Sequence, residues 1–286
     1  MTKRGASPEL VLFTATTGRT GSTSLVELFQ RNVPGCVAEH EPGYQPETVY
    51  ERLYEALFLR RVRKLDRRGF GRALQWYDRG ERVLDRLVHL RARRIRRLGC
   101  RVYLESNHAF LSSLGDALVE EFPNLGLIHL VRDPMEVAVS HCNRNTRPAG
   151  SPDFLRALGA WHPHPEARRN CLVPPAGDLT CFQYYLWVWL ECERRRLRFL
   201  ERNPAVRCFR LLTPDLNEPA RIAELFAFFG LPVDSGRLVV PPARNRNAEV
   251  TRVDERHREE ARDLLRRLGP GVLAGLPATF GLADLL

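Results

Sequence analysis

One stretch decides the fold class: LVLFTATTGRTGSTSLVELFQR, residues 10–31. Its first seven residues are apolar or β-branched, which is typical of a buried strand. Residues 17–24 contain two glycines and indicate a tight loop. Apolar residues then recur at helical spacing over 25–29, and Ser22 or Thr23 is available to cap the helix. A strand, a glycine loop and a helix in this order predict the front of a phosphate-binding α/β unit.

The alternation of strands and helices continues along the chain. Further strands are expected at 35–39, 101–105, 125–131 and 206–211, and further helices at 115–122, 134–142, 181–200, 220–229 and 255–268. This alternation predicts an α/β fold of three layers, P-loop-like, with a central, mainly parallel sheet flanked by helices. We expect one domain over residues 1–286, with an Arg-rich helical insertion at 47–99 and a lid loop at 145–178.

Charge and cysteine content limit the function classes. The chain has 44 Lys and Arg residues against 34 Asp and Glu, a net charge of +10, which implies an anionic partner. The Arg-dense segment 60–97 predicts a solvated helix face; a grip on an acidic acceptor and a peripheral contact with an anionic membrane are the alternatives. Seven cysteines without a CxxC pair favour reduced thiols in a cytoplasmic protein. The sequence contains no apolar run of about 18 residues, so we expect no membrane span, and we expect no signal peptide.

The loop over residues 17–24 has the chemistry of an anion site. Gly18 and Gly21 allow the backbone to turn its N–H groups inward, and Arg19 can donate two parallel hydrogen bonds to a phosphate. Hydroxyl donors stand at Thr20, Ser22, Thr23 and Ser24. A triphosphatase loop needs four residues between its glycines and a following Lys, and both are missing here. The alternative without function is an ordinary capped turn.

A second motif ends the strand at 125–131. Arg132, Asp133 and Pro134 follow this strand, and Ser140 lies two helical turns further on. Because ligands of open α/β sheets bind at strand carboxyl ends, Arg132 and Ser140 could converge on one phosphate. The alternative is that Arg132 only pairs with Asp133 at a helix start.

Taken in this order, the two motifs resemble those of the PAPS-dependent sulfotransferase family, in its carbohydrate and bacterial branch. The resemblance covers residues 10–41 and 101–144. It implies a donor, 3'-phosphoadenosine 5'-phosphosulfate (PAPS), a product, adenosine 3',5'-bisphosphate, and no metal. It places the 5'-phosphosulfate on the loop 17–24 and the 3'-phosphate on Arg132 and Ser140. Arg246, in a late basic segment, is a further candidate for the 3'-phosphate.

The same resemblance suggests the base that takes the proton of the acceptor. Glu41, followed by Pro42, is similar to the Glu-Pro of the carbohydrate branch and is the favoured base. Counting without a one-residue gap places Glu39 there instead, and His40 is the third choice, with a part in substrate binding as its other role. Such a base removes the proton of a hydroxyl, while Arg19 stabilises charge on the leaving phosphate.

Asn107 and His108 follow the strand at 101–105 and should open onto the same sheet edge. We expect both near the sulfuryl group or the acceptor, and His108 is also a catalytic candidate. The acceptor is expected to be a carbohydrate, a lipid or another natural-product hydroxyl.

Two other classes of function are alternatives to a sulfotransferase. A nucleotide-dependent, kinase-like phosphotransferase would bind ATP with magnesium, and a basic module would bind nucleic acid, which is not expected. A sulfotransferase fold without activity is a related alternative. His162 and His164 lie in the expected lid but lack partners at metal-ligand spacing, so no metal is predicted.

Overall fold

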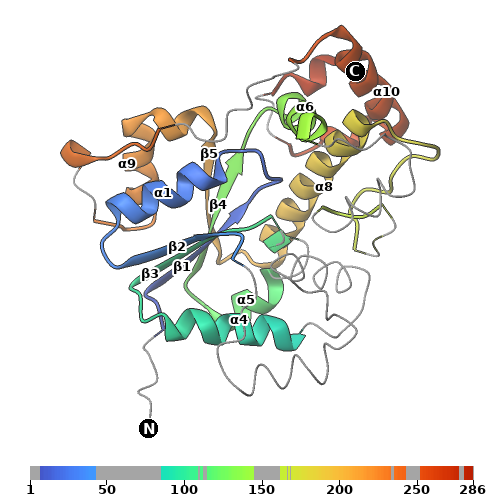
Figure 1. Ribbon diagram of the computed structural model, residues 1–286. Helices are drawn as coiled ribbons and strands as arrows, with labels where there is room; N and C mark the ends of the chain where they lie inside the picture. The colour runs from blue at the N-terminus through green and yellow to red at the C-terminus, as the bar shows by residue number, and fades with distance from the viewer. Residues whose placement is uncertain are drawn as a thin grey trace.

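A five-stranded parallel sheet forms the centre of the protein (Figure 1). The computed structural model describes residues 7–42, 85–108, 110–111, 115–144, 162–165, 167, 169–232, 235–242, 252–276 and 280–285. The strands are β1 (Leu10–Ala15), β2 (Cys36–His40), β3 (Val102–Ser106), β4 (Leu125–Val131) and β5 (Arg207–Leu212). Their order is β2-β3-β1-β4-β5, and every pair is parallel. The predicted α/β class with a parallel sheet flanked by helices is confirmed.

One face of the sheet is covered by α1 (Ser22–Asn32) and α9 (Pro219–Phe228), which lie side by side in Figure 1. Successive side chains of a strand point to opposite faces, so Leu10 and Leu12 of β1 share this face. They pack in one buried cluster with Phe29 of α1 and Phe226 of α9. This apolar layer fixes α1, and therefore the loop that precedes it, on the sheet.

The opposite face is covered by α4 (Asp85–Arg97), α5 (Gly115–Glu121) and the end of α8 (Cys181–Arg202). Val11 and Phe13, the other half of the β1 alternation, pack there with Ile95 and Phe199. The ring of Phe13 stacks on Phe110 at 4.8 Å between centroids. The sheet is therefore buried on both sides, as a parallel sheet requires.

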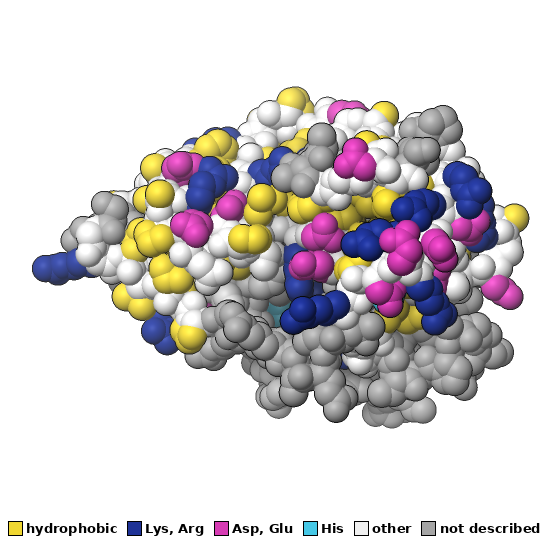
Figure 2. Space-filling view, turned by 90° about the horizontal axis from the view of Figure 1, so that it is seen from above, with side chains coloured by type: hydrophobic (Ala, Val, Ile, Leu, Met, Phe, Trp, Pro, Cys, Tyr) yellow, Lys and Arg dark blue, Asp and Glu magenta, His cyan; other side chains and the backbone are white. Residues whose placement is uncertain are grey.

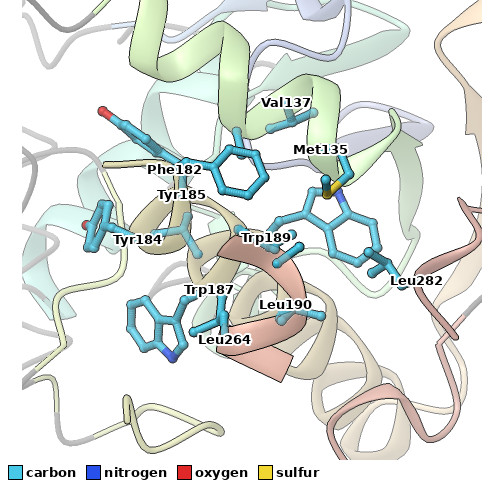
Figure 3. Packing of buried hydrophobic residues seen from close by; sticks show 14 of the residues in the cluster. Met135, Val137, Phe182, Tyr184, Tyr185, Trp187, Trp189, Leu190, Leu264 and Leu282 are labelled. Carbon is cyan, nitrogen blue, oxygen red and sulfur yellow. The ribbon is translucent and has the colours of Figure 1, made fainter. Parts of the chain in front are cut away.

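A third buried cluster lies beside the sheet, between α6 (Pro134–Arg144), α8 and α10 (Glu255–Leu268). Figure 3 shows its aromatic rings, from Phe182 to Trp189, packed between these helices. Thr180 is the N-cap of α8 and forms a capping box. Its hydroxyl accepts from the Gln183 N–H group, and the Gln183 side-chain oxygen accepts from the Thr180 N–H group. Short 3₁₀ helices connect or end the later elements: Pro214–Asn217, Ser235–Arg237, Pro270–Leu273 and Leu282–Leu285.

The start of α1 differs from the sequence prediction. Ser22 or Thr23 was expected to be the N-cap of this helix, but the N-cap is Gly21, which has no side chain that could make a capping bond. The predicted position of the cap is therefore wrong. Most of the expected insertion, 47–84, lies outside the described residues, whereas α4 falls in its final part.

The strand order places a change of direction at β1. From β1 the chain moves by way of α1 to β2 at one edge of the sheet, and from β3 it crosses by way of α5 to β4 on the other side of β1. Connections that diverge in this way leave a crevice at the strand carboxyl ends, where open α/β sheets bind their ligands. The loop after β1 lies at this point.

Candidate active site

The loop after β1 curves through a series of left-handed residues. The φ angles are 81° at Gly18, 59° at Arg19 and 91° at Gly21. At Gly21 a Cβ atom would also lie 2.7 Å from Leu216 Cδ1, so only glycine fits there. Backbone of this kind gathers its N–H groups on the concave side and makes an anion-binding nest next to the positive end of α1.

Three elements hold the carbonyl groups of this loop from outside. The Thr17 carbonyl lies 3.3 Å from His141 Nε2 of α6. The Arg19 carbonyl accepts from Arg132 Nη1, after β4, at 3.3 Å, and the Thr20 carbonyl accepts from Thr213 Oγ1, after β5, at 2.8 Å. The backbone of the loop is therefore held from three sides through its carbonyl oxygens, and within the loop the Gly18 N–H group donates to Thr16 Oγ1 at 3.3 Å. His141 and Thr213 were not predicted from the sequence.

Arginine side chains gather around the loop. Arg19 Nε donates to Ser140 Oγ at 3.0 Å, so the two sequence motifs meet at Arg19. Burial lowers the pKa of Arg19, and the positive charges of Arg144 and Arg132 lower it further. Such repulsion is relieved when an anion binds. Arg144 was missed, although it lies one turn after Ser140 on the same face of α6.

Arg132 and Asp133 have separate partners. Arg132 Nε donates to Glu136 Oε2 at 2.9 Å, while the Asp133 carboxylate accepts the Glu136 N–H group at 3.0 Å and so caps α6. Burial raises the pKa of Asp133. The other end of the Arg132 guanidinium is directed to the loop, as described above, so this residue does more than start a helix.

The predicted hydroxyl donors differ in their surroundings. Thr20 is buried, and its Oγ1 lies 2.5 Å from Thr16 Oγ1, which fixes the loop internally. Ser22 is also buried, whereas Thr23 and Ser24 are half-buried on the first turn of α1. Arg246 lies outside the described residues.

Glu41 and His108 form a pair at the ends of β2 and β3. His108 Nδ1 lies 2.9 Å from Glu41 Oε1, with the Glu41 side chain 37% exposed and that of His108 9% exposed. The Glu41 N–H group donates to the Ser106 carbonyl, which extends the pairing of the two strands. Burial opposes ionisation of Glu41, but the hydrogen bond from His108 and the charges of His108, His40 and Arg144 outweigh it and lower its pKa to about 2. Glu41 is therefore a carboxylate at neutral pH.

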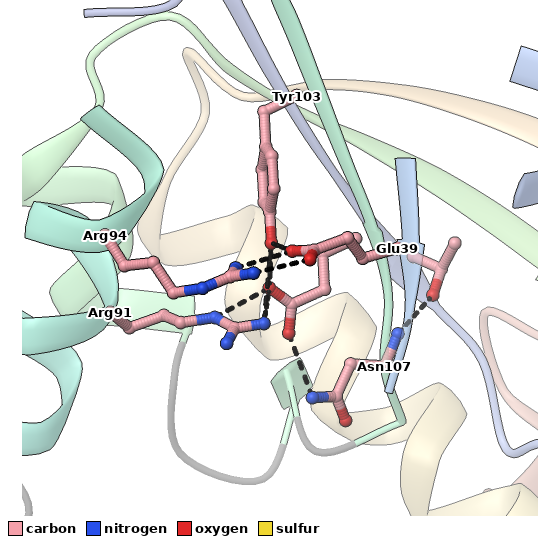
Figure 4. Close-up of polar contacts among 7 residues, drawn as sticks. Glu39, Arg91, Arg94, Tyr103 and Asn107 are labelled. Carbon is pink, nitrogen blue, oxygen red and sulfur yellow. Dashed lines mark hydrogen bonds and ion pairs between the residues drawn. The ribbon is translucent and has the colours of Figure 1, made fainter. Parts of the chain in front are cut away.

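Glu39 belongs to a different cluster (Figure 4). Its two carboxylate oxygens accept from Arg94 Nη1 and Nη2 of α4, both at 2.6 Å, and one lies 2.8 Å from the Tyr103 hydroxyl. Burial opposes ionisation, but the bonds from Arg94 and Tyr103 outweigh it, and the pKa of Glu39 is lowered. His40, the last residue of β2, is exposed. The carboxylate of Glu39 thus pairs with Arg94 of α4, whereas that of Glu41 pairs with the imidazole of His108.

A buried ion pair lies beside Glu39. Arg91 of α4 donates from Nε and Nη2 to Glu105 Oε2, at 3.0 and 2.6 Å, with both side chains almost fully buried. Glu105 Oε1 accepts from Asn107 Nδ2 at 3.0 Å, and the Asn107 N–H group donates to Thr14 Oγ1 at 3.2 Å. The side chain of Asn107 is therefore oriented by Glu105 (Figure 4).

These contacts correct the interpretation of the Arg-dense segment for two of its residues. Arg91 and Arg94 were included in a predicted solvated face, but both point to the carboxyl end of the sheet and pair with carboxylates. Arg93, in contrast, is exposed. Sequence periodicity could not separate them, because the partners Glu39 and Glu105 lie on other elements.

Histidine rings line the space between the Glu41–His108 pair and the loop. The ring of His162 lies 5.4 Å from that of His108 and 4.8 Å from that of His141, between centroids. His141 stacks on Tyr185 of α8 at 4.5 Å. Burial lowers the pKa of His141 to about 3, with help from the charge of Arg19, and burial also holds the pKa of His162 well below its usual value. Figure 2 shows histidine and arginine side chains together in a recess of this face.

Two kinds of feature are absent from the part of the chain that the structure describes. No group of three or more His, Cys, Asp and Glu side chains in it is arranged to hold a metal ion. No helix in it has both the length and the apolar character needed to cross a membrane.

The fold and the site define a class: an α/β protein with a glycine loop, three arginines and a carboxylate–imidazole pair at the carboxyl edge of one parallel sheet. No protein-family model and no curated protein matches the chain.

Solved structures that resemble the chain include sulfotransferases. The sulfotransferase from Alicyclobacillus acidocaldarius is 17% identical, with a TM-score of 0.49, over 96% of this chain and 96% of that one. The sulfotransferase domain of the Synechococcus PCC 7002 olefin synthase is 16% identical, with a TM-score of 0.45, over 98% of this chain and 87% of that one. Sulfotransferase STF1 from Mycobacterium tuberculosis H37Rv is 16% identical, with a TM-score of 0.45, over 82% and 70%. Similarities this low carry no inference about activity, which has to come from the residues of the site.

Proposed function

We propose that this protein is a sulfotransferase that moves a sulfuryl group from PAPS to the hydroxyl of a carbohydrate, lipid or natural-product acceptor. One observation supports the proposal: the loop after β1 and the motif after β4 meet at Arg19, through its contacts with Ser140 and Arg132, and Glu41 pairs with His108 at the same edge of the sheet. PAPS has two anionic groups on one ribose, the 5'-phosphosulfate and the 3'-phosphate, so it requires two such elements on one sheet edge.

Each part of the donor has a proposed holder. The N–H groups of the loop 18–22 and the Arg19 guanidinium would bind the 5'-phosphosulfate, with hydroxyl donors from the start of α1. Arg132 and Ser140 would bind the 3'-phosphate, with Arg246 as a further candidate. The charge of Arg144 lowers the pKa of both Arg19 and Glu41. Arg144 would therefore add positive charge near the sulfuryl group.

The reaction is an in-line displacement at sulfur. The acceptor oxygen forms a bond to sulfur as the bond between sulfur and the 5'-phosphate oxygen breaks, and adenosine 3',5'-bisphosphate leaves. Arg19 and the loop N–H groups stabilise the charge that develops on the leaving phosphate. The acceptor hydroxyl loses its proton to a base on the other side of the sulfur.

We assign the base to the pair Glu41 and His108. His108 Nδ1 lies 2.9 Å from Glu41 Oε1, so in the tautomer with the proton on Nδ1 the carboxylate of Glu41 accepts this N–H bond. This leaves His108 Nε2 with the lone pair that takes the proton, and the imidazolium that forms is stabilised by Glu41. Glu39, held by Arg94, is the weaker alternative.

Donor binding tests the first half of the proposal. Calorimetric titration with adenosine 3',5'-bisphosphate should detect binding to the wild-type protein. Arg19→Met should weaken it about 10- to 100-fold, because a charge-assisted hydrogen bond contributes about 1.5–3 kcal/mol. A protein that binds ATP with magnesium but not the bisphosphate would support the kinase-like alternative. Strongly salt-dependent binding to many nucleic acids, without bisphosphate binding, would support the nucleic-acid module.

Turnover tests the second half. With radiolabelled PAPS and a panel of sugar, lipid and phenolic acceptors, His108→Asn should lower turnover about 10²- to 10⁴-fold, the usual contribution of a general base. Glu41→Gln should also lower turnover. Both variants should keep the wild-type affinity for the bisphosphate. Unchanged turnover in both would show that the pair is not the base.

A further inference from the structure

The donor loop, residues 16–21, directly follows β1, and the proposed base and the residues that hold the loop lie on opposite sides of this strand. Glu41 and His108 follow β2 and β3, whereas His141 and Arg132, which hold the loop, follow β4. Sulfuryl transfer requires the base, the acceptor oxygen and the sulfur to lie in a fixed geometry. Some part of the protein must therefore fix the distance between these two sides.

The ring of His162 occupies this intermediate position. It packs against His108 on one side and, edge to face, against His141 on the other. His141 in turn lies against the loop, with its Nε2 3.3 Å from the Thr17 carbonyl. Contacts therefore run from Glu41 through three imidazoles to the donor loop. The ring of Tyr185 meets His162 edge to face at 5.5 Å between centroids and supports it from α8.

The residues after His162 are anchored to α8. The Pro163 carbonyl accepts from the Tyr184 hydroxyl at 3.1 Å. Asn170 Nδ2 donates to the His164 and Pro165 carbonyls, both at 2.9 Å, and its Oδ1 accepts from Arg195 at 2.7 Å. His162 is thus presented by backbone that is tied at several points.

The electrostatic surroundings favour a spacer over a proton carrier. His108, His141 and Tyr185 contact the ring, the charges of Arg19 and Arg144 act on His141, and the charge of Glu41 lies against His108. Burial and the neighbouring histidines hold His162 neutral. A neutral ring next to His108 adds no positive charge that would oppose protonation of the base.

We propose that His162 is a positioning residue whose ring sets the distance and orientation of His108 relative to the donor loop. This inference rests on the proposed function, in which His108 takes the acceptor proton. It assigns a site role to a residue of the expected lid that neither sequence motif includes.

The test compares His162→Ala, which removes the ring, with His162→Phe, which keeps its shape without a titratable nitrogen. Three quantities are measured: turnover of radiolabelled PAPS, with water and with the acceptor panel; the affinity for adenosine 3',5'-bisphosphate; and the His108 tautomer, from ¹⁵N NMR of the imidazole nitrogens. The control is His257→Ala, which removes a ring packed on Phe182 at 4.9 Å, away from the loop, and reports the effect of lost stability alone.

We expect His162→Ala to lower turnover about 10- to 100-fold, the effect of a displacement of about 1 Å in a reacting group. Its bisphosphate affinity should stay within about twofold, and the signal of a single His108 tautomer should be replaced by that of a mixture. His162→Phe should restore most of the turnover. His257→Ala should turn over like the wild type.

Two results would overturn the inference. One is a His162→Ala protein with wild-type turnover and a single His108 tautomer. The other is a Phe variant as impaired as the Ala variant, which would indicate that the ring transfers protons. Failure of the proposed function gives a different result, since the wild-type protein would then neither bind the bisphosphate nor turn over PAPS. The NMR comparison would still decide whether His162 holds His108.

Discussion

The donor loop, residues 16–21, and the base edge, residues 39–41 with 105–108, lie on one edge of the same sheet but are held by different forces. The loop is fixed by hydrogen bonds to its own carbonyl groups, from His141, Arg132 and Thr213. The base edge is fixed by ion pairs with α4, of which Arg91–Glu105 is almost fully buried. The loop is thus held by hydrogen bonds to its backbone, and the base edge is held by ion pairs between side chains.

This difference has consequences for how each region fails. Loss of one hydrogen bond to a carbonyl costs about 0.5–1.5 kcal/mol, and the loop has several. Loss of one partner of a buried ion pair leaves a charge with no counter-ion and costs about 3–5 kcal/mol. Damage to the base edge should therefore appear as lost stability, and damage to the loop as lost donor affinity.

The largest expected effect follows from Arg91. Arg91→Met should lower the free energy of unfolding by about 3–5 kcal/mol, because Glu105 would remain buried without its counter-ion. The matched change Arg94→Met should cost less, since Arg94 and Glu39 are 21% and 22% exposed and water can solvate the carboxylate that is left. Urea denaturation measures both. Equal losses would contradict the distinction, and the double variant Arg91→Met with Glu105→Gln should recover part of the stability.

An intermediate effect is expected from the pH dependence of His141. Its pKa is about 3 in the folded protein against an ordinary value of 6.5, so between these values the unfolded chain binds a proton that the folded chain does not. The stability due to neutral His141 is therefore present above about pH 6.5 and is lost as the pH falls towards 3.

His141→Asn lacks this dependence, so its deficit in stability relative to the wild type should shrink as the pH is lowered from 7 to 4. Urea denaturation at several pH values in this range checks the prediction. His89→Asn, which changes an exposed histidine, provides the control. Parallel curves for His141→Asn and the wild type would mean that His141 titrates normally in the fold.

The smallest expected effect concerns the loop. Thr213→Val removes the hydroxyl that donates to the Thr20 carbonyl at 2.8 Å but keeps the shape of the side chain. Affinity for adenosine 3',5'-bisphosphate should fall about 2- to 10-fold, in line with one hydrogen bond. Thr213→Ser keeps the hydroxyl and should bind like the wild type. A Val variant that lost stability but not donor affinity would show that Thr213 supports β5 instead of the loop.

The two regions also differ in how well they can be predicted. The strand at 125–131 and the helix at 255–268 were predicted at the residues where they occur, because their periodicity is local. Arg132 and Ser140 were predicted to converge on one phosphate; the structure brings both into contact with Arg19, and the phosphate site stays a prediction. The cap predicted at Ser22 or Thr23 was wrong, because the N-cap is Gly21, which has a positive φ angle and no side chain.

The base edge resisted prediction for a physical reason. Arg94 and Glu39 are 55 residues apart in the chain, and nothing local marks one as the partner of the other. His162 and His108 are also far apart in the chain. A single histidine in a Pro-rich segment follows no helical or strand periodicity, so the sequence does not predict its contacts. Both arrangements depend on which strands become neighbours.

The sequence by itself determined the parallel α/β fold, and it predicted the loop at residues 17–24 and the second motif at Arg132 and Ser140 as the sites of the donor. Strand alternation, helical spacing and glycine geometry are properties of residues close together in the chain. Only the tertiary structure decided that Glu41 pairs with His108, that Glu39 pairs with Arg94 of α4 and that the ring of His162 contacts both His108 and His141. These contacts arise because the strand order places the ends of β2, β3, β1 and β4 at one edge, where distant residues meet.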